Sequence, residues 1–346
     1  MKLGKVVVVG GFGLVGRELL QVMKNHNWQI EQLVIIGYRT AGKAQATPYG
    51  ELTVKSLDDR VFVGAQFVFF AAGAKVSQDV IPNLRGKGFR IIDLSSAFRY
   101  EPNVPLVIPS INGGVIGKAD LIACPNCTTS IALMVLAPIH RIYKITRVNL
   151  VSFQSASGAG KDALDDLEEQ IKRWANDGQP PKQGQTGNMV YPLAGNLIPQ
   201  IDFLVPAWAG MTREEMKTHW ETNKMLFNPS GRYWFDDVAV IATCVRVPVR
   251  RCHSEVLTIQ TAKRVNLNKL RDLLGNSFGV TLLDDTVNDY YPMPLNMEGK
   301  EEVGVGRIRL APVANSKEIV LWVCGDQLLR GAALTALEIA EYILLH

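Results

Sequence analysis

The spacing of hydrophobic residues changes close to residue 126 and divides the chain into two regions. In the first region, short apolar runs rich in Val, Ile and Phe alternate with stretches of helical periodicity. This alternation is typical of βαβ units and predicts a parallel sheet with helices on both faces. The predicted strands lie at 6–9, 33–36, 67–71 and 90–94, and the predicted helices at 14–25 and 76–87.

In the second region the apolar segments are longer and alternate with polar positions, which predicts a mixed or antiparallel sheet. Residues 176–196 are polar and rich in Gly, Pro and Gln. They predict a long surface loop, either a mobile linker or an arm that grips a second subunit. The predicted strands lie at 147–157, 238–249, 256–265 and 318–323, and the predicted helices at 162–174, 213–226 and 328–345.

Length and composition exclude several classes of protein. At roughly 150 residues per domain the length indicates two domains, and 47% hydrophobic residues are enough for a large core. The 37 Lys and Arg and 33 Asp and Glu are dispersed, which argues against nucleic acid binding. No apolar run reaches the roughly 18 residues of a membrane span, and the first nine residues predict a strand instead of a signal peptide. Five scattered Cys argue against a disulfide framework. We therefore expect a cytoplasmic α/β protein.

A glycine-rich loop follows the first predicted strand and opens the first predicted helix. Its residues, Gly11-Phe12-Gly13-Leu14-Val15-Gly16, fit the pattern G-x-G-x-x-G in the context that this motif requires. The glycines allow the backbone to turn tightly and to approach a pyrophosphate at the positive end of the helix. The alternative is an ordinary strand-to-helix turn, but the context favours dinucleotide binding.

The segment after the second strand indicates which dinucleotide binds. An NAD site would carry Asp or Glu there to hold the ribose hydroxyls. The sequence instead has Gly37-Tyr38-Arg39-Thr40-Ala41-Gly42-Lys43, without an acidic residue. Arg39 and Thr40 suit a 2′-phosphate, which a carboxylate would repel. The alternative for Arg39 is a solvated loop charge; we expect NADP.

Cys127 lies where an apolar strand gives way to a long apolar helix. The helix macrodipole stabilises a thiolate at this position, so its nucleophilicity at neutral pH rises. Cys124 and Cys127 also form C-x-x-C, but no second such pair and no suitably spaced His pair accompanies them, so we expect no metal site. The alternative is a buried structural thiol, which we favour for Cys124.

A cysteine nucleophile needs an acid/base partner, and His253 is the best placed histidine. It follows Arg246-Val247-Pro248-Val249-Arg250-Arg251-Cys252 at the start of a strand. From the sequence alone, a catalytic base and a structural histidine are about equally good interpretations.

Further polar residues have no obvious structural purpose. Arg99 closes a loop just after a parallel strand, where sites of α/β proteins lie. Glu221 and Lys224 are one helical turn apart on one face, a spacing that is more often a solvated ion pair. Gln154 precedes a second small-residue loop, 155–160, for which simple helix capping is the alternative.

Taken together, these residues resemble the aspartate-semialdehyde dehydrogenase family over essentially the whole chain. No single segment is decisive, but seven or more in the family's order are highly specific. The matching segments are the glycine loop, 39–43, 95–99, 125–127, 154–160, 221–224, 246–253, and Gly325-Asp326-Gln327 followed by Gly331-Ala332-Ala333.

The resemblance implies a role for each matching position. Cys127 corresponds to the acyl-forming nucleophile, His253 to the general acid/base and Gln154 to the residue that positions substrate and intermediate. The substrate-binding positions are Arg99, Asn126 and Lys224 for phosphate, Arg246 for the substrate carboxylate and Glu221 for its amino group. Ser157, Gly158 and Gln327 correspond to cofactor contacts near the nicotinamide. Phe12 and Thr40 depart from the usual Thr and Ser of the family.

The resemblance also implies a fold and a reaction. We expect a Rossmann-type NADP-binding domain at 1–126, joined by the C-terminal helix 327–346, and an α+β catalytic and dimerisation domain with a mixed sheet at 127–326. The implied reaction is the NADPH-dependent reductive dephosphorylation of L-aspartyl-4-phosphate to L-aspartate-4-semialdehyde, in lysine (through diaminopimelate), threonine and methionine biosynthesis. The implied assembly is a homodimer or a tetramer.

Two alternatives stay open. N-acetylglutamyl-phosphate reductase has similar chemistry, but its nucleophile typically lies in Pro-Gly-Cys-Tyr-Pro, whereas this chain has Pro125-Asn126-Cys127-Thr128-Thr129, and Glu221 suits a free amino group. Glyceraldehyde-3-phosphate dehydrogenase shares Cys-Thr-Thr but differs in its anion binders. A catalytically silent NADP-binding paralogue is the other alternative, and the intact Cys127, His253, Arg246 and Gln154 argue against it.

Overall fold

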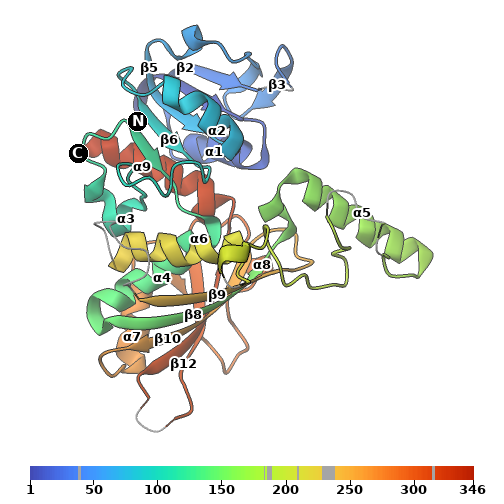
Figure 1. The fold of residues 1–346 in the computed structure, drawn as a ribbon, viewed down its shortest axis with the longest axis vertical. Helices are drawn as coiled ribbons and strands as arrows, with labels where there is room; N and C mark the ends of the chain where they lie inside the picture. The colour runs from blue at the N-terminus through green and yellow to red at the C-terminus, as the bar shows by residue number, and fades with distance from the viewer. Residues whose placement is uncertain (38–39, 183, 185–188, 209, 228–237, 314–315) are drawn as a thin grey trace. The chain divides into compact units, whose positions relative to one another are not determined.

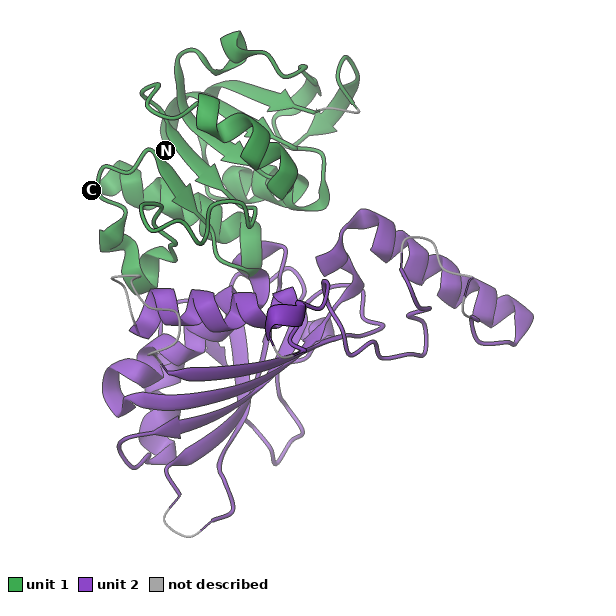
Figure 2. Cartoon of the chain, viewed as in Figure 1, with its two compact units in different colours: residues 1–126, 331–346 green, residues 127–330 purple. Residues whose placement is uncertain are grey.

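The computed structural model describes every residue except 38–39, 183, 185–188, 209, 228–237 and 314–315 (Figure 1). The chain forms two compact units, which Figure 2 distinguishes by colour. Unit 1 contains residues 1–126 and 331–346, and unit 2 contains residues 127–330. The first boundary therefore falls between Asn126 and Cys127, and the second lies at 330 where the sequence suggested 326.

Unit 1 is built on a five-stranded sheet with the order β2-β1-β5-β6-β7, in which all neighbouring strands are parallel. The chain places β2 on one side of β1 and β5 on the other, so the strand order reverses at β1. In open parallel sheets, ligands bind at the carboxyl ends of the strands at such a reversal. The strands span Lys2–Val9 (β1), Gln29–Ile36 (β2), Ala65–Phe70 (β5), Arg90–Asp93 (β6) and Leu121–Ala123 (β7).

The central strands of unit 1 are hydrophobic on both faces because both faces are covered. Residues 6–9 and 67–70 are at most 1% exposed, as is typical of parallel strands between helical layers. The last helix, α9, contacts α1, α3 and β6. The helices are α1 (Leu14–Asn25), α2 (Ala74–Val80), α3 (Pro109–Asn112) and α9 (Leu334–Leu345), and a hairpin pairs β3 (Ala44–Thr47) with β4 (Gly50–Thr53).

Unit 2 contains a six-stranded mixed sheet with the order β11-β12-β13-β10-β8-β9. The pairs β11/β12 and β8/β9 are parallel, and the other pairs are antiparallel. The strands are β8 (Ile145–Gln154), β9 (Ala239–Arg246), β10 (His253–Thr261), β11 (Val280–Leu282), β12 (Val303–Leu310) and β13 (Glu318–Gly325).

Helices cover one face of the unit 2 sheet (Figure 1). The apolar helix α4 contacts β8, β10 and β13, and it also contacts its neighbours α6 and α7. Burial of α4 along almost its whole length holds its first residue, Cys127, in a fixed position at the sheet. The helices are α4 (Cys127–Tyr143), α5 (Lys161–Asp177), α6 (Arg213–Thr222), α7 (Leu267–Gly275) and α8 (Pro294–Met297).

The predicted fold class, a Rossmann-type domain with a second, mixed-sheet domain, is confirmed. Some element ends differ. The strand predicted at 147–157 ends at Gln154 and is followed by a 3₁₀ turn, Ala156–Ala159. The helix predicted at 328–345 begins with a π-helical turn, Leu329–Ala333. Within the described residues, no helix has the length and apolar character needed to cross a membrane.

The segment predicted as a long loop, 176–196, overlaps the end of α5 and lies partly outside the described residues. Its final part is anchored. The backbone N–H groups of Leu193 and Ala194 donate to Oε1 of Gln170 on α5, at 2.8 and 2.9 Å. The two side chains also pack into a small buried cluster with Leu167 and Ala156. The anchoring ties this end of the segment to α5 and to the turn after β8.

Candidate active site

Cys127 and His253 lie together in unit 2. Cys127 is the first residue of α4 and His253 the first residue of β10, and their Sγ and Nε2 atoms are 3.5 Å apart. Cys127 is partly exposed, whereas the other four cysteines are buried. His253 is fully buried. The pair therefore combines an accessible sulfur with an imidazole that is held by the protein interior.

The backbone of Ser155 determines the tautomer of His253. Its N–H group is 3.1 Å from Nδ1, and because a backbone N–H can only donate, Nδ1 must accept. The neutral ring therefore carries its proton on Nε2, the atom that faces Cys127. Burial and the nearby Arg246 charge lower the pKa of His253 to about 3, against smaller opposing effects of Glu214 and the Cys252 backbone. At neutral pH the sulfur faces an N–H donor.

Gly158 lies directly against this histidine. A Cβ atom at Gly158 would be 2.7 Å from Cε1 and 2.9 Å from Nε2 of His253, and 3.0 Å from Nη1 of Arg246. No side chain fits there without displacing one of the two residues. Gly158, predicted as a cofactor contact, thus also leaves room for the imidazole and the guanidinium.

Arg246 is the last residue of β9 and pairs with Gln154 in the sheet register. Arg246 is 6% exposed, and its guanidinium donates from Nη1 to the Ser155 carbonyl at 2.7 Å. Burial lowers the pKa of Arg246, while the carboxylate of Glu214 opposes the shift. A buried guanidinium with one donor engaged keeps further N–H groups for an anionic ligand.

Gln154, the last residue of β8, is buried at the same end of the sheet. Its side-chain Nε2 lies 2.8 Å from Thr128 Oγ1, 3.2 Å from Ser152 Oγ and 3.3 Å from Glu214 Oε1. Thr128 is the residue after Cys127. These contacts place the amide of Gln154 beside the start of α4.

Ser157 and Gln327 hydrogen-bond each other, with Nε2 of Gln327 2.6 Å from Oγ of Ser157. Gln327 Oε1 accepts from the backbone N–H of Cys252 at 2.7 Å, and Ser157 donates to the Arg250 carbonyl. Both predicted cofactor contacts therefore tie the turn after β8 to the segment that leads into His253.

Glu221 lies near the end of α6, and Lys224 lies in the turn that follows it. The helix begins with a capping box, in which Thr212 and Glu215 exchange hydrogen bonds, and it continues beyond Thr222 as a π-helical turn, Asn223–Phe227. The single helix predicted at 213–226 is therefore wrong in its last turn. Glu221 is fully buried and Lys224 is partly exposed.

Arg99 and Asn126 belong to unit 1 and are each 6% exposed. Arg99 donates from Nε to the Cys124 carbonyl at 2.8 Å and from Nη2 to the Leu94 carbonyl at 3.2 Å. Its loop is fastened by the buried Asp93, which accepts from Ser77 and from the backbone and hydroxyl of Ser95. Burial raises the pKa of Asp93, although these hydrogen bonds and Arg99 oppose the shift.

The glycine loop lies at the reversal of strand order in unit 1. A Cβ atom at Gly16 would collide with the Gly10 carbonyl oxygen and approach the Gly11 Cα to 2.6 Å. Gly13 is exposed, precedes α1 and has no side chain that caps the helix. Among the described residues, a Cβ atom there would meet the Gly10 carbonyl oxygen at 3.5 Å, an ordinary contact. Uncapped N–H groups at such a helix start fit a pyrophosphate.

The predicted 2′-phosphate residues follow β2. Arg39 lies outside the described residues. Thr40 is partly buried, and its hydroxyl occupies the space that a side chain at Gly37 would need. Thr40 follows the carboxyl end of β2, the strand that pairs with β1.

Two contributors to the site, Glu214 and the backbone of Ser155, are not apparent from the sequence. Glu214 resembles any acidic residue in the first turn of a helix, so its sequence context gives no signal of a site. A backbone N–H group gives no sequence signal at all, because every residue except Pro has one.

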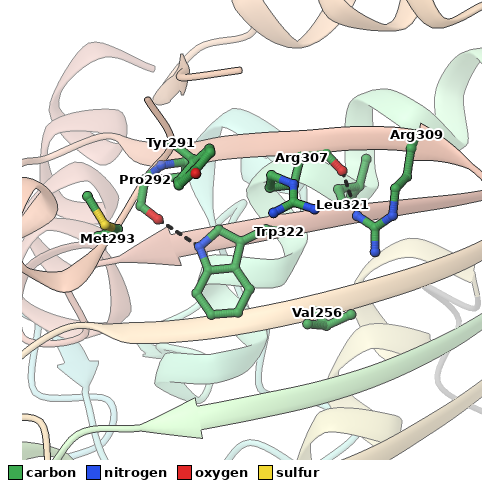
Figure 3. A pocket seen from close by; sticks show the side chains of 8 residues that line it. All are labelled: Val256, Tyr291, Pro292, Met293, Arg307, Arg309, Leu321 and Trp322. Carbon is green, nitrogen blue, oxygen red and sulfur yellow. Dashed lines mark hydrogen bonds between the residues drawn. The ribbon is translucent and has the colours of Figure 1, made fainter. Parts of the chain in front are cut away.

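A separate pocket of about 330 Å³ lies over the unit 2 sheet (Figure 3). Trp322 donates from its indole N–H to the Pro292 carbonyl at 2.7 Å at one end, and Arg307 lies over the Tyr291 ring. The pocket contains neither cysteine nor histidine. Within the described part of the chain, no group of three or more His, Cys, Asp or Glu side chains is arranged to hold a metal ion.

A dinucleotide loop on a parallel sheet, together with a cysteine–histidine pair in a second unit, defines a nicotinamide-dependent oxidoreductase with a reactive cysteine. Residues 5–119 match the family described as "Semialdehyde dehydrogenase, NAD binding domain", and residues 136–330 match "Semialdehyde dehydrogenase, dimerisation domain". The chain belongs to the aspartate-semialdehyde dehydrogenase family, and it carries both the dinucleotide-binding and the dimerisation domain of that family.

Individual relatives match over nearly their whole length. Proteins named aspartate-semialdehyde dehydrogenase from Prochlorococcus marinus and Aquifex aeolicus are 38% and 36% identical, each over 98% of this chain and over 95% and 97% of the relative. The crystal structure of aspartate semialdehyde dehydrogenase II from Vibrio cholerae is 32% identical, with a TM-score of 0.89 and coverage of 100% of this chain and 99% of that one.

Proposed function

We propose that this chain catalyses the reductive dephosphorylation of L-aspartyl-4-phosphate to L-aspartate-4-semialdehyde through a thioester on Cys127. The observation that carries the proposal is the short distance between two atoms. Sγ of Cys127, at the start of α4, is 3.5 Å from Nε2 of the buried His253. The names of the full-length relatives support the substrate. The same reaction supplies lysine, threonine and methionine biosynthesis.

In the first half of the reaction, Cys127 forms the thioester. The positive end of α4 and the Nε2–H group of His253 both stabilise the thiolate, which raises the fraction of reactive sulfur at neutral pH. The sulfur attacks the acyl carbon, a C–S bond forms, and the C–O bond to phosphate breaks with its electron pair leaving on phosphate. We assign the binding of phosphate to Arg99, Asn126 and Lys224, whose donors and positive charges stabilise the departing anion.

In the second half, the thioester is reduced to the aldehyde. NADPH, when bound, supplies the hydride for this step. The oxygen of the resulting adduct on Cys127 becomes negatively charged, and His253 is the group that can donate to it from Nε2. A positioned acid/base of this kind typically contributes on the order of 10²- to 10⁴-fold. Collapse of the adduct breaks the C–S bond and returns the thiolate.

Substrate selection depends on two buried charges and an amide. We propose that Arg246 binds the substrate carboxylate, because the planar guanidinium offers two parallel donors that a lysine lacks. Glu221 binds the amino group, and Gln154 orients the reacting group. An acetylated amino group carries no charge for Glu221, which disfavours the N-acetylglutamyl-phosphate alternative.

We propose NADP as the preferred dinucleotide. Gly11, Gly13 and Gly16, with the peptide groups of Phe12, Leu14 and Val15, would hold the pyrophosphate. Arg39 and Thr40 would hold the 2′-phosphate, and Ser157, Gly158 and Gln327 the nicotinamide end. The bare backbone at Gly13 and the absence of an acidic residue at 37–43 support this assignment.

We propose that the chain works as a homodimer or a dimer-based tetramer in the cytoplasm. The match to a dimerisation domain supports self-association. All five cysteines are free thiols, four of them buried, which fits a reducing compartment.

The test is the formation of NADPH, measured by absorbance, from L-aspartate-4-semialdehyde, NADP and inorganic phosphate, with each component omitted in turn. Turnover should require all three and disappear in Cys127→Ala, whereas Cys244→Ala, which alters a buried thiol on β9, should keep most of it. Turnover of N-acetylglutamate semialdehyde instead would favour the rival reductase. NADP binding without turnover would favour the silent paralogue.

A further inference from the structure

Glu214 is a buried carboxylate that the proposed reaction leaves without a role. It lies in the first turn of α6 and is 5% exposed. Its Oε1 atom is 3.3 Å from Nε2 of Gln154, and its Oε2 atom is 2.9 Å from Nζ of Lys217. The carboxylate thus connects the surface of unit 2 to the amide beside Cys127.

Lys217 forms an ion pair with Glu214. The ammonium group is also 2.8 Å from Oδ2 of Asp202. Burial lowers the pKa of Lys217, but the charges of Glu214 and Asp202 raise it by more, so the net shift is upward and the lysine stays charged. A charged lysine at this distance stabilises the negatively charged form of the carboxylate. In that form the group can accept hydrogen bonds but cannot donate them.

An ionised Glu214 decides which way the amide of Gln154 points. The neighbouring hydroxyls of Thr128 and Ser152 can donate or accept, and they would tolerate either end of the amide. A carboxylate can only accept, so the NH₂ group must face Glu214, because a reversed amide would place two oxygen atoms about 3.3 Å apart. Each hydrogen bond of the Gln154 side chain within the described residues involves Nε2.

We infer that Glu214 is a positioning residue, which fixes Gln154 so that its carbonyl oxygen meets the substrate. Gln154 then acts as a hydrogen-bond acceptor for a donor on the substrate or on the adduct. It does not donate to the negatively charged oxygen, and that task falls to His253. The inference rests on the proposed function of Gln154 as the residue that orients the reacting group.

The first variant is Glu214→Gln. Its amide oxygen can still accept from Lys217, which turns its NH₂ group toward Gln154. The Gln154 amide must then reverse, so that its NH₂ group faces the substrate in place of its carbonyl oxygen. Loss of a hydrogen bond to a charged group predicts a fall in kcat of roughly 10- to 100-fold. The KM for NADP should stay within about twofold of the wild type, because the change leaves the dinucleotide loop intact.

The second variant exchanges the two side chains, Glu214→Gln with Gln154→Glu. The amide at 214 then donates to the carboxylate at 154, whose other oxygen remains an acceptor for the substrate. The exchange should recover at least tenfold of the kcat that Glu214→Gln loses. Glu215→Gln is the matched control, since the described contacts of Glu215 cap α6 and accept from the Cys244 N–H, away from Gln154. It should lower thermal stability but not kcat.

Two results would overturn the inference: a kcat for Glu214→Gln within twofold of the wild type, or an exchange variant no faster than Glu214→Gln although both are folded. Wild-type turnover of L-aspartate-4-semialdehyde is measured in parallel. Failure of that turnover contradicts the proposed function, whereas normal wild-type turnover with an unaffected variant contradicts only the role of Glu214.

Discussion

Substitution of Gly158 by alanine is a sharp steric test of the Cys127–His253 arrangement. The added methyl group would lie 2.7 Å from Cε1 of His253, and carbon atoms in ordinary contact are at least about 3.4 Å apart. The ring, or the turn that carries residue 158, must therefore move by about 0.7 Å. Because His253 is fully buried, the movement is transmitted to its neighbours.

The size of the effect follows from the geometry. A displacement of about 1 Å at reacting groups can cost about 100-fold in rate, so we expect kcat to fall roughly 10- to 100-fold. Overpacking a buried position costs about 1–3 kcal/mol, which is less than the usual 5–15 kcal/mol of folding stability. The variant should be folded, with a lower Tm and a much lower rate.

The assay is the rate of Cys127 alkylation by iodoacetamide at pH 7 without cofactor, together with kcat and Tm. Since Gly158 is also a proposed cofactor contact, a changed alkylation rate in the absence of NADP isolates the effect on the cysteine–histidine pair. Gly114→Ala is the control, because its added Cβ meets no atom of the described residues within 4 Å. If Gly158→Ala has the same alkylation rate and the same kcat as the wild type, the steric argument is refuted.

Three further predictions follow from the same geometry. In Gly16→Ala, the collision with the Gly10 carbonyl should weaken NADP binding at least tenfold by calorimetry, and unchanged affinity would count against the loop assignment. Burial raises the pKa of Glu255 well above its usual value, so the stability present below about pH 4.5 is lost as pH rises toward the pKa of the folded state. Relative to wild type, Glu255→Gln should therefore gain up to about 1.4 kcal/mol in free energy of unfolding per pH unit over that range, measured by urea unfolding. The same pH dependence of that free energy in both proteins would contradict this. Because the pKa of His253 is lowered to about 3, its stability contribution is present above about pH 6.5 and lost only as pH falls toward 3. Its ¹⁵N spectrum at pH 6 should therefore show a neutral ring protonated on Nε2, and an imidazolium signal there would refute the tautomer.

Elements with strong local signals were predictable from the sequence. The helix α1 lies at 14–25, as predicted, because a glycine loop marks its start and its apolar spacing is regular. The strand β12 was not predicted. Its Gly304 and Gly306 break the apolar pattern, and both are needed because a side chain would meet Met297 and Pro292, or the Leu283 carbonyl. That crowding comes from the tertiary fold, so no local pattern reveals it.

In the candidate site, too, local features could be predicted from the sequence and long-range contacts could not. The residue type and the helix-start context of Cys127 are local features, and the resemblance to a family added the remaining positions. The partners that orient the site are distant in sequence: Glu214 meets Gln154 across 60 residues, and Ser155 meets His253 across 98. The packing of α6 against β9 brings Glu214 to Gln154, and the pairing of β8 with β10 brings Ser155 to His253.

The most direct test of the central claim is mass spectrometry, of the intact enzyme and of its peptides, after incubation with L-aspartate-4-semialdehyde and NADP in the absence of phosphate. A thioester on Cys127 predicts an added aspartyl group on the peptide that contains this residue, and its release when phosphate is supplied. No adduct on a wild-type enzyme that turns over, or an equal adduct on Cys127→Ala, would contradict the account.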